Sequence, residues 1–394
     1  MKFRKLGQSM NLKGKRVLIR IDGNVPIEKG RAIDGPHGRI ARSAVDINWL
    51  SQRGAKVIVM THLGRPNGRR ISAYSVKPVA KRLSSLLGAK VEVTRSVVGK
   101  DVEKFISRMH DGDVLMLENL RFDRREEENA PSFAEALAKF GDLYVNDAFA
   151  VSHRAHASVD AITGFLPSYA GPLLATEVSV LNKLEERVKR PFVLVLGGLK
   201  MSTKLPIIER FLPQLDQLVV GGALANVFLV ASGKSVGKSV YEEESVDSAK
   251  RLLKKYAKRI LLPTDVVCVR SLRRDAKREV RRVDKIGSND RIIDIGPATR
   301  KAFALALETS KTILWNGPLG YCEIEEFCDG TREVAHVIAG LTGKVTTIVG
   351  GGDTLPVIES LKLADKFTLL STGGGALLEF LSGKSLPGVD ALST

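Results

Sequence analysis

Residues 192–204 read FVLVLGGLKMSTK, an apolar run followed by two glycines and two lysines. Five apolar residues in succession, at 192–196, are typical of a parallel strand that is buried on both faces of its sheet. Glycines directly after such a strand let backbone N–H groups approach a phosphate, and the N-terminus of a following helix adds positive potential. The stretch therefore predicts a strand, turn and helix of an open α/β sheet, with an anion bound beyond the carboxyl end of the strand.

Apolar runs of the same kind alternate with helical patterns in both directions from this stretch. In the first half the runs lie at 17–21, 56–60, 114–117 and 143–147, separated by amphipathic stretches at 41–54, 76–88 and 132–141. In the second half the runs lie at 192–196, 217–220, 259–262, 312–315, 345–349 and 367–370. This repetition predicts an α/β fold with two doubly wound, Rossmann-like parallel-sheet domains.

The length of the chain, 394 residues, is too great for one ordinary core and also favours two domains. A stretch with helical periodicity, 169–190, separates the two series of apolar runs, and we expect it to form a helix that bridges the domains. The predicted domains are 1–168 and 191–383. No apolar run approaches the roughly 18 residues that a membrane span needs, so we expect a soluble chain.

The charge of the chain indicates an anionic partner. Its 61 basic and 44 acidic residues leave a formal net charge of +17, which suits either a small polyanion or a nucleic acid. The densest basic run, 269–285, has no interleaved aromatic residues that could stack on bases. A solvated strand or hairpin is therefore the favoured interpretation of this run, ahead of a nucleic-acid contact.

Two other features are expected to carry no chemistry. The three cysteines, Cys268, Cys322 and Cys328, are too few for a disulfide framework and lack zinc-like spacing, so we expect buried or neutral thiols in a reducing cytosol. The segment 233–239, GKSVGKS, has only three residues between its glycines and follows a helical pattern. It is therefore predicted to be a helix-ending loop and not a P-loop.

In the first half, polar side chains follow four predicted strands at the point where each strand ends. They are Asp22, Asn24, His62, Arg65, Arg121 and Arg154, and Arg39, on a loop before a helix, could join them. The carboxyl ends of parallel strands meet at one edge of a sheet, where ligands bind. Because arginine makes planar, bidentate contacts to phosphate and carboxylate, the cluster predicts a ligand with several negative charges.

In the second half, glycine clusters follow three predicted strands, at 197–198, 350–352 and 373–375. Lys200 and Lys204 are expected near one face of a first helical turn, from which both could reach phosphate oxygens. Asp353 is a candidate ligand for the Mg²⁺ that accompanies a nucleotide, since Mg²⁺ takes few protein carboxylates. Three such clusters in one sheet predict a nucleotide-phosphate site.

Together these segments resemble the phosphoglycerate kinase family. The similarity extends from Val17 to the segment LPGVDAL at 386–392. The segments that carry it are THLGRP (61–66), ENLRF (118–122), YVNDAF (144–149), HRAH (153–156), GGLKMSTK (197–204), WNGPLG (315–320), GGGDT (350–354) and STGGGA (371–376).

The resemblance implies a 3-phosphoglycerate site in the first domain and an ATP or ADP site in the second. The implied substrate-binding residues are Asp22, Gly23, Asn24, Arg39, His62, Leu63, Gly64, Arg65, Arg121 and Arg154. The implied nucleotide-binding residues are Gly198, Lys204, Gly222, Asn316, Pro318, Glu323, Gly351, Gly352, Asp353 and Thr354, with Asp353 also on Mg²⁺. The implied catalytic residues are Arg39, Lys200 and Gly374, and a tail at about 384–394 is expected to pack back on the first domain.

Four positions depart from the pattern that is usual in the family. They are Gly23, where a loop-anchoring aromatic is expected, and Leu199, Thr203 and Ala223. None of the four removes a charged group that the resemblance assigns to chemistry. We therefore expect the departures to bear on affinity and loop rigidity more than on activity.

The activity implied by the resemblance is direct, in-line phosphoryl transfer between 1,3-bisphosphoglycerate and MgADP in a monomeric, cytoplasmic kinase of glycolysis. Hinged closure around the bridging helix would bring the two ligands together. The alternative is a nucleic-acid-binding protein on the same fold, suggested by the charge of +17. A NAD-dependent dehydrogenase is excluded because no G-x-G-x-x-G follows the first predicted strand.

Overall fold

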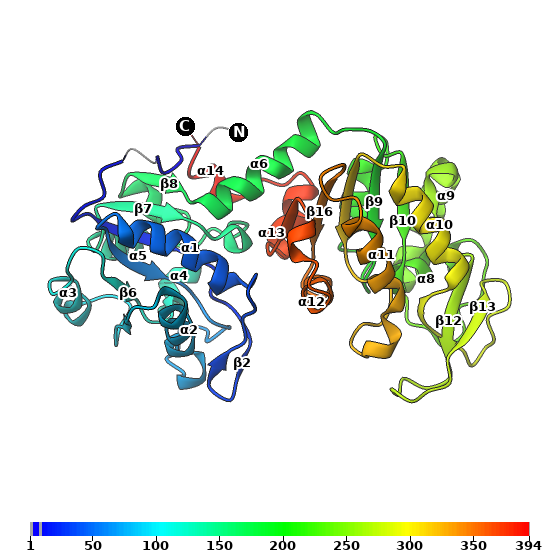
Figure 1. Ribbon diagram of the computed structural model, residues 1–394, viewed down its shortest axis with the longest axis horizontal. Coiled ribbons are helices and arrows are strands. Elements are labelled where there is room, and N and C mark those ends of the chain that lie inside the picture. The colour runs from blue at the N-terminus through cyan, green and yellow to red at the C-terminus, as the bar shows by residue number, and fades with distance from the viewer. Residues whose placement is uncertain (1–2, 8–9, 394) are drawn as a thin grey trace. The chain divides into compact units, whose positions relative to one another are not determined.

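The computed structural model describes residues 3–7 and 10–393 (Figure 1). Positions 1–2, 8–9 and 394, which belong to the predicted first domain and to the predicted tail, lie outside the described residues. The chain divides into two compact units, Met1–Asn182 with Lys384–Thr394, and Lys183–Gly383. The boundary between them falls inside helix α6 (Pro172–Glu186).

The first unit is built on a sheet of six parallel strands in the order β5-β6-β4-β1-β7-β8. The strands are β1 (Arg16–Arg20), β4 (Lys56–Met60), β5 (Val91–Val93), β6 (Val114–Met116), β7 (Leu143–Asn146) and β8 (Ser168–Ala170). The four apolar runs predicted as strands are confirmed. The sequence did not reveal β5 and β8 because these short strands, VEV and SYA, are only partly buried and do not form a continuous apolar run.

Helices cover both faces of this sheet. On one face, α1 (Arg39–Gln52) and α2 (Lys77–Leu87) bury Ile47 and Leu83 against Val17 and Val57. On the other face, α3 (Lys100–Ile106) and α5 (Pro131–Ala138) cover Leu18 and Ile58 with side chains such as Phe133. Full burial of each such side chain contributes about 1.5–3 kcal/mol. The continuous apolar strands of the sequence thus follow from burial on both faces.

The second unit has its own six-stranded parallel sheet, in the order β11-β10-β9-β15-β16-β17. Its strands are β9 (Phe192–Leu196), β10 (Gln217–Val220), β11 (Ile260–Leu261), β15 (Thr312–Asn316), β16 (Thr346–Gly350) and β17 (Leu369–Ser371). All six predicted runs are confirmed. The chain moves outward from β9 to β11, then returns to β15 beside β9 and moves the other way. Such a reversal marks the place where open α/β sheets bind ligands.

Helices also cover both faces of the second sheet. α10 (Pro297–Glu308) and α11 (Asp329–Ala339) place Phe303 and Ile338 in one core with Trp315 of β15. On the other face, the ring of Phe211 in α7 (Leu205–Phe211) meets the ring of Phe192 edge to face, with centroids 5.8 Å apart. The remaining helices are α8 (Gly222–Ala231), α9 (Val246–Tyr256), α12 (Leu355–Ser360) and α13 (Gly375–Leu381). The predicted class, two doubly wound α/β domains, is therefore confirmed.

A three-stranded antiparallel sheet, β13-β12-β14, is an addition that the sequence did not predict. Its strands are β12 (Asp265–Val269), β13 (Glu279–Arg282) and β14 (Arg291–Ile295). The basic run 269–285 forms the β12–β13 hairpin, as expected for a solvated surface. Its arginines pair with nearby acids, for example Arg273 with Asp275 at 2.9 Å and Arg282 with Asp284 at 3.1 Å.

Three predicted boundaries were wrong. The bridging helix starts at Pro172 and not at 169, because Tyr169 and Ala170 belong to β8 and because proline suits the first position of a helix. Arg39 is the first residue of α1 and not part of a loop before it. The helix after the glycines at 197–198 begins only at Leu205, so Lys200 and Lys204 lie in the loop. The prediction for 233–239 is confirmed, since this segment follows the end of α8.

The C-terminal segment lies against β7 in the first unit (Figure 1). The side-chain amide of Asn146 donates to the carbonyl of Gly388 at 3.0 Å, and Gly388 N–H donates to the carbonyl of Ser152 at 2.9 Å. Gly388 is the second residue of α14 (Pro387–Asp390). A Cβ at this position would lie 2.3 Å from the side chain of Val159. Only glycine permits this close approach. Across the described part of the chain, no helix combines the length and apolar character needed to span a bilayer.

Candidate active site

The polar residues predicted in the first unit lie beyond four adjacent strands, β6, β4, β1 and β7. Arg39, the first residue of α1, contacts the loop after β1. Its Nη1 lies 2.9 Å from Asp22 Oδ2 and donates to the carbonyl of Asn24 at 2.9 Å. Asn24 Oδ1 in turn accepts a hydrogen bond of 2.9 Å from Gly64 N–H. The loops after β1 and β4 and the start of α1 thus form one connected group.

Gly23, one of the departures from the family's pattern, lies close against the loop after β4. Its N–H donates to Thr61 Oγ1 at 2.8 Å, and a Cβ at this position would also lie 2.8 Å from that oxygen. The loop is therefore anchored through the backbone, by the hydroxyl of Thr61, without an aromatic side chain.

Arg121 joins the loop after β6 to the same group. Its Nη1 donates to the carbonyl of Gly64 at 2.8 Å, and its Nε lies 3.3 Å from Glu127 Oε1. Burial lowers the pKa of Arg121 to about 10, against the opposing effect of Glu127. The amide of Asn119 donates to the carbonyl of Leu63 at 2.7 Å, which fixes the backbone beside His62.

A buried network beneath these loops was missed by the sequence analysis. Arg20, fully buried in β1, lies 3.1 Å from His62 Nδ1 and donates to Ser158 Oγ at 3.1 Å. Ser158 Oγ donates to Glu126 at 2.6 Å. A guanidinium only donates, so His62 Nδ1 accepts and its Nε2 carries the proton. Burial holds the pKa of His62 well below its ordinary value, and the positive charge of Arg20 is the second cause. The ring is therefore neutral.

Positive charge dominates this edge of the sheet. Burial lowers the pKa of His156 to about 3, and the next causes are the guanidinium groups of Arg121, Arg20 and Arg154. Arg154 Nε donates to His153 Nε2 at 3.1 Å, and Arg65 is exposed. The arrangement can bind a small ligand with several negative charges. The one signal for the missed network was an arginine inside a buried apolar run.

In the second unit, the predicted glycines lie where the strand order reverses, between β9 and β15. Gly197 N–H donates to the carbonyl of Asn316 at 3.0 Å, and Gly198 N–H donates to the carbonyl of Pro318 at 2.8 Å. A Cβ at Gly197 would lie 2.0 Å from the oxygen of Pro318. Glycine is therefore required for the two loops to approach each other.

A cavity of about 340 Å³ opens beside these loops. Five of the predicted nucleotide-binding residues line it: Gly198, Gly222, Pro318, Glu323 and Asp353. Much of the remaining wall is apolar and comes from α8 (Leu229), from the unpredicted antiparallel sheet (Val266 and Ile292) and from two loops (Val240 and Leu319). An apolar cavity with a few convergent polar groups suits a flat, largely apolar ring that carries a polar tail.

Three of the predicted polar residues are joined to the glycine loops by hydrogen bonds: Lys204, Asn316 and Thr354. Lys204 Nζ donates to Asn316 Oδ1, and the Asn316 amide donates to the carbonyl of Gly350 at 3.1 Å. Thr354 Oγ1 accepts from Gly317 N–H at 3.1 Å. Burial lowers the pKa of Lys204 to about 8, while the nearby Asp353 acts in the opposite direction. Lys200, in the same loop, is exposed.

The remaining predicted residues lie at the starts of two short helices. Gly351, Gly352 and Asp353 precede α12, and Gly374 caps α13 with φ at +48°, which favours glycine. Within the described ranges, the Asp353 carboxylate makes no ion pair or hydrogen bond, and no cluster of three metal-ligating side chains exists. One available carboxylate beside the cavity fits Mg²⁺ that takes its other oxygens from nucleotide phosphates and water.

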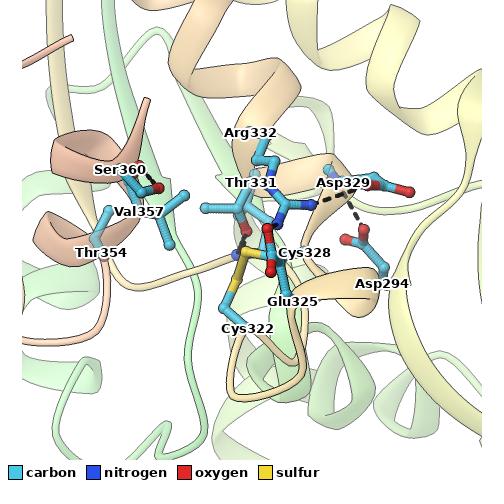
Figure 2. Close-up of a disulfide and its surroundings, with 12 residues drawn as sticks. Asp294, Cys322, Glu325, Cys328, Asp329, Thr331, Arg332, Thr354, Val357 and Ser360 are labelled. Carbon is cyan, nitrogen blue, oxygen red and sulfur yellow. Dashed lines mark hydrogen bonds and ion pairs between the residues drawn. A yellow bond between two sulfur atoms is a disulfide. The ribbon is translucent and has the colours of Figure 1, made fainter. Parts of the chain in front are cut away.

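The prediction of three thiols was wrong. Cys322 and Cys328 form a disulfide (Figure 2), and Cys322 lies next to Tyr321 and Glu323 of the cavity wall. Cys268 is a buried free thiol. The spacing of the cysteines did not reveal the bond, because it depends on the chain folding back to begin α11 directly after Cys328. Asp294 also lines the cavity and was not predicted, and burial raises its pKa to about 7.

The sequence pattern of the phosphoglycerate kinase family matches residues 8–384. The chain belongs to this family. Phosphoglycerate kinases from Herpetosiphon aurantiacus and Dictyoglomus turgidum are each 45% identical to it, over 96% and 97% of this chain and 96% of each relative.

Solved structures of the phosphoglycerate kinase family agree with this assignment. The phosphoglycerate kinase from Coxiella burnetii matches with a TM-score of 0.86 at 39% identity, covering 99% of both chains. That from Pyrococcus horikoshii matches with a TM-score of 0.86 at 30% identity, covering 99% of this chain and 98% of the other. The two-sheet architecture is thus that of the phosphoglycerate kinase family.

Proposed function

We propose that this chain transfers a phosphoryl group reversibly between 1,3-bisphosphoglycerate and MgADP, giving 3-phosphoglycerate and ATP. The observation that carries the proposal is the pairing of two sites in a chain of this family. One unit has an arginine-rich edge at the carboxyl ends of four parallel strands. The other has a glycine-lined, largely apolar cavity at the reversal of its strand order.

The acidic substrate would bind in the first unit. Arg65, Arg121 and Arg154 would hold the phosphate and carboxylate by charge-assisted hydrogen bonds, since arginine presents several donors in a fixed plane. His62 supports this role as a neutral donor, because Arg20 occupies its Nδ1 and leaves the proton on Nε2. The ion pair between Arg39 and Asp22, at 2.9 Å, would orient Arg39 toward the transferred group.

The nucleotide would bind in the second unit. Its base would enter the apolar part of the cavity, Glu323 would accept hydrogen bonds from the ribose hydroxyls, and Lys204 would contact the phosphates. Gly351, Gly352 and Thr354 would place backbone N–H groups near the phosphates. Asp353 would hold Mg²⁺ on the phosphate oxygens, where the ion neutralises charge at the nucleotide end.

Transfer itself needs alignment and neutralisation of charge more than covalent chemistry. Arg39, Lys200 and the backbone at Gly374 would hold the three equatorial oxygens of the moving phosphoryl group. The carboxylate of 3-phosphoglycerate is already a nucleophile, so no general base is needed. The transfer would be direct and in line, with no phosphorylated side chain as an intermediate.

Cytoplasmic location and a monomeric state complete the proposal, as expected for an enzyme of glycolysis. The nucleic-acid alternative has no observation in its favour. Five arginines of the densest basic run form ion pairs with acids, for example Arg278 with Asp329 at 3.3 Å. An arginine engaged in this way is less available to phosphates of a nucleic acid.

The experiment is a coupled assay of ATP formation from 1,3-bisphosphoglycerate and ADP with Mg²⁺. We expect turnover that requires both substrates and the metal ion. The matched control is Asp353→Asn, which keeps the shape of the side chain and should raise the Mg²⁺ requirement. Absence of ATP formation from wild-type protein at saturating substrate would overturn the proposal.

A further inference from the structure

The disulfide between Cys322 and Cys328 encloses a residue that the proposed function assigns to the nucleotide. The two cysteines are separated by six positions, and Glu323 lies between them on the wall of the cavity. Gly320 and Tyr321, just before the disulfide, line the same wall. The bond therefore closes a small covalent ring around one side of the nucleotide pocket.

The C-terminal half of this ring is also held by noncovalent contacts. Phe327 is fully buried, and Arg278 Nη1 donates to the carbonyl of Glu326 at 2.7 Å. Arg332 lies between Glu325, at 3.4 Å, and Asp329, at 3.2 Å (Figure 2). Arg274 of the basic hairpin pairs with Glu326. These contacts would keep residues 325–329 in place without the disulfide.

The half that carries Glu323 has fewer contacts of its own. Tyr321 N–H donates to the carbonyl of Ile293 at 2.7 Å, and Cys322 Sγ lies 3.3 Å from Thr331 Oγ1. Among the residues that the structure describes, the Glu323 side chain has no hydrogen bond or ion pair. The disulfide is thus the covalent constraint that fixes Glu323 relative to the well-anchored half of the ring.

The cavity wall is coupled to the same sulfur. Thr331 Oγ1, next to Cys322 Sγ, accepts from Leu319 N–H at 2.9 Å, and the carbonyl of Leu319 accepts from Gly222 N–H at 3.0 Å. Leu319 and Gly222 both line the cavity. A change at Cys322 can therefore act on the pocket through a chain of direct contacts.

We propose that Cys322 and Cys328 form a thiol–disulfide exchange site that sets the affinity of the pocket for nucleotide, with a dithiol as its reducing partner. The inference rests on the proposed function, because it assigns a regulation to the proposed nucleotide site. In the oxidised state Glu323 is preorganised for the ribose. In the reduced state Cys322 and Glu323 gain freedom, and the nucleotide must order them on binding.

The exchange begins at the more accessible sulfur. Cys322 is half-buried, whereas Cys328 is 2% exposed, so a thiolate of the dithiol attacks Cys322 Sγ. The Cys322–Cys328 bond breaks, a mixed disulfide forms on Cys322, and Cys328 leaves as a thiolate. Cys328 is the N-cap of the 11-residue helix α11, whose N-terminus favours a negative leaving group.

The second thiolate of the reductant completes the exchange. It attacks the reductant's own sulfur in the mixed disulfide, and Cys322 is released as a thiolate. Two electrons pass to the protein, the dithiol becomes a disulfide, and its two protons end on the cysteine sulfurs. Oxidation by a disulfide of the same class reverses each step.

The proposed cytoplasmic location favours a switchable bond over a purely structural one. Disulfides are rare in a reducing compartment, and those that form there are usually transient, catalytic or redox-sensing. The ring is short, so its closure constrains only a local part of the unfolded chain. The large parallel-sheet cores of this chain do not need it. Its effect is therefore expected at the pocket and not in global stability.

The test compares oxidised and dithiothreitol-reduced protein by calorimetry with MgADP and, separately, with 3-phosphoglycerate. Thiol counts under denaturing conditions define the two states, because the disulfide leaves one free thiol of three cysteines. We expect reduction to weaken MgADP binding about three- to tenfold, and to leave 3-phosphoglycerate binding unchanged. The variant C322S/C328S should match reduced wild type and should not respond to dithiothreitol. Cys268→Ser is the matched control, and it should respond as wild type does.

A second variant tests whether the effect acts through Glu323. In Glu323→Ala, which weakens MgADP binding by itself, reduction should cause no further loss, because residues in one contact network are not additive. Equal MgADP affinity of oxidised and reduced wild-type protein would overturn the inference and leave the proposed function intact. Absence of MgADP binding in both states would overturn the proposed function, and the inference with it.

Discussion

The ammonium group of Lys204 donates a hydrogen bond to the side-chain oxygen of Asn316, which ties the loop before α7 to the end of β15. The two residues are 112 positions apart in the sequence and meet where the strand order reverses. Lys204 is 8% exposed, and the charge of Asp353 acts on its pKa. A buried lysine at the mouth of a phosphate loop makes nucleotide binding sensitive to pH.

Nucleotide affinity should fall as the pH rises through about 8. Burial lowers the pKa of Lys204 to about 8, so the free protein loses this charge above that pH. Because phosphates bind the charged form, the Kd for MgADP at pH 9 should be about tenfold higher than at pH 7. Calorimetry across this range measures it. The side chain of the Lys204→Arg variant stays charged throughout this range. The Kd of the variant for MgADP should therefore depend much less on pH. A Kd that rises as steeply with pH as in wild type would assign the titration to another group.

Lys200→Ala should lower turnover by a factor of about 10²–10³ and leave the Kd for MgADP nearly unchanged. The reason is that the variant loses one preorganised charge that acts mainly in the transition state. Lys200 is exposed in the loop before α7, so its removal leaves no cavity in the core. Steady-state assays and calorimetry separate the two effects. Lys344→Ala, at another exposed lysine, is the matched control. A Lys200→Ala protein that keeps more than half of wild-type turnover would refute the catalytic assignment.

Arg65→Ala and Arg154→Ala should each weaken 3-phosphoglycerate binding and spare MgADP binding. Both arginines lie in the first unit, whereas the glycine loops and the cavity lie in the second. Loss of a charged hydrogen-bond donor should cost about 1.5–3 kcal/mol of binding free energy. Calorimetry with each ligand alone measures this. Equal weakening of both ligands by either variant would show that the ligands are not divided between the units.

Asp46→Asn should flatten the dependence of stability on pH. Asp147 Oδ1 accepts from Leu173 N–H, in the first turn of α6, at 2.9 Å, and the neighbouring carboxyl of Asp46 acts on the pKa of Asp147. Burial holds the pKa of Asp147 well above its ordinary value, and the negative charge of Asp46 is the second cause. The folded protein therefore binds more protons than the unfolded chain, and its stability falls as the pH rises through that raised pKa.

Thermal unfolding at pH 5.5 and pH 8 measures this dependence. At pH 8 the variant should gain about 1 kcal/mol, or about 2–4 °C in the unfolding midpoint of a unit of this size. Asp111→Asn, at an exposed position, is the matched control. A variant whose midpoint depends on pH as steeply as that of wild type would show that the pair does not share a proton.

The parallel sheets could be predicted because their strands are buried on both faces. Val17 and Leu18 face opposite helical layers, so both are apolar and the run is continuous. The glycine loops were also visible, because close backbone approach excludes other residues. The antiparallel strands were not visible: β13 reads EVRR and is half-exposed, so its charges hide the strand pattern.

The candidate site could be predicted only where its residues lie on loops after strands. The role of Arg20 was not predicted, because a charged residue within β1 does not reveal its partners. These partners are distant in the sequence: Ser158 is 138 positions away and His62 is 42 positions away. The disulfide was not predicted for a similar reason. Its formation depends on where α11 begins, and a spacing of two cysteines does not report that.

In the proposed reaction, each substrate binds to its own unit and the phosphoryl group passes directly between the two ligands. Direct transfer needs reacting atoms about 3–3.5 Å apart, and water must be excluded. We therefore propose that the units close on each other when both ligands are bound, with α6 and the loops beside it as the hinge.

Small-angle scattering measures this closure. The radius of gyration should fall when 3-phosphoglycerate and a nonhydrolysable MgATP analogue are both bound, and fall less with either ligand alone. Arg154→Ala at a 3-phosphoglycerate concentration that saturates only wild type should behave as if the analogue were present alone. An unchanged radius with both sites of the wild-type protein saturated would contradict transfer between ligands held on separate units.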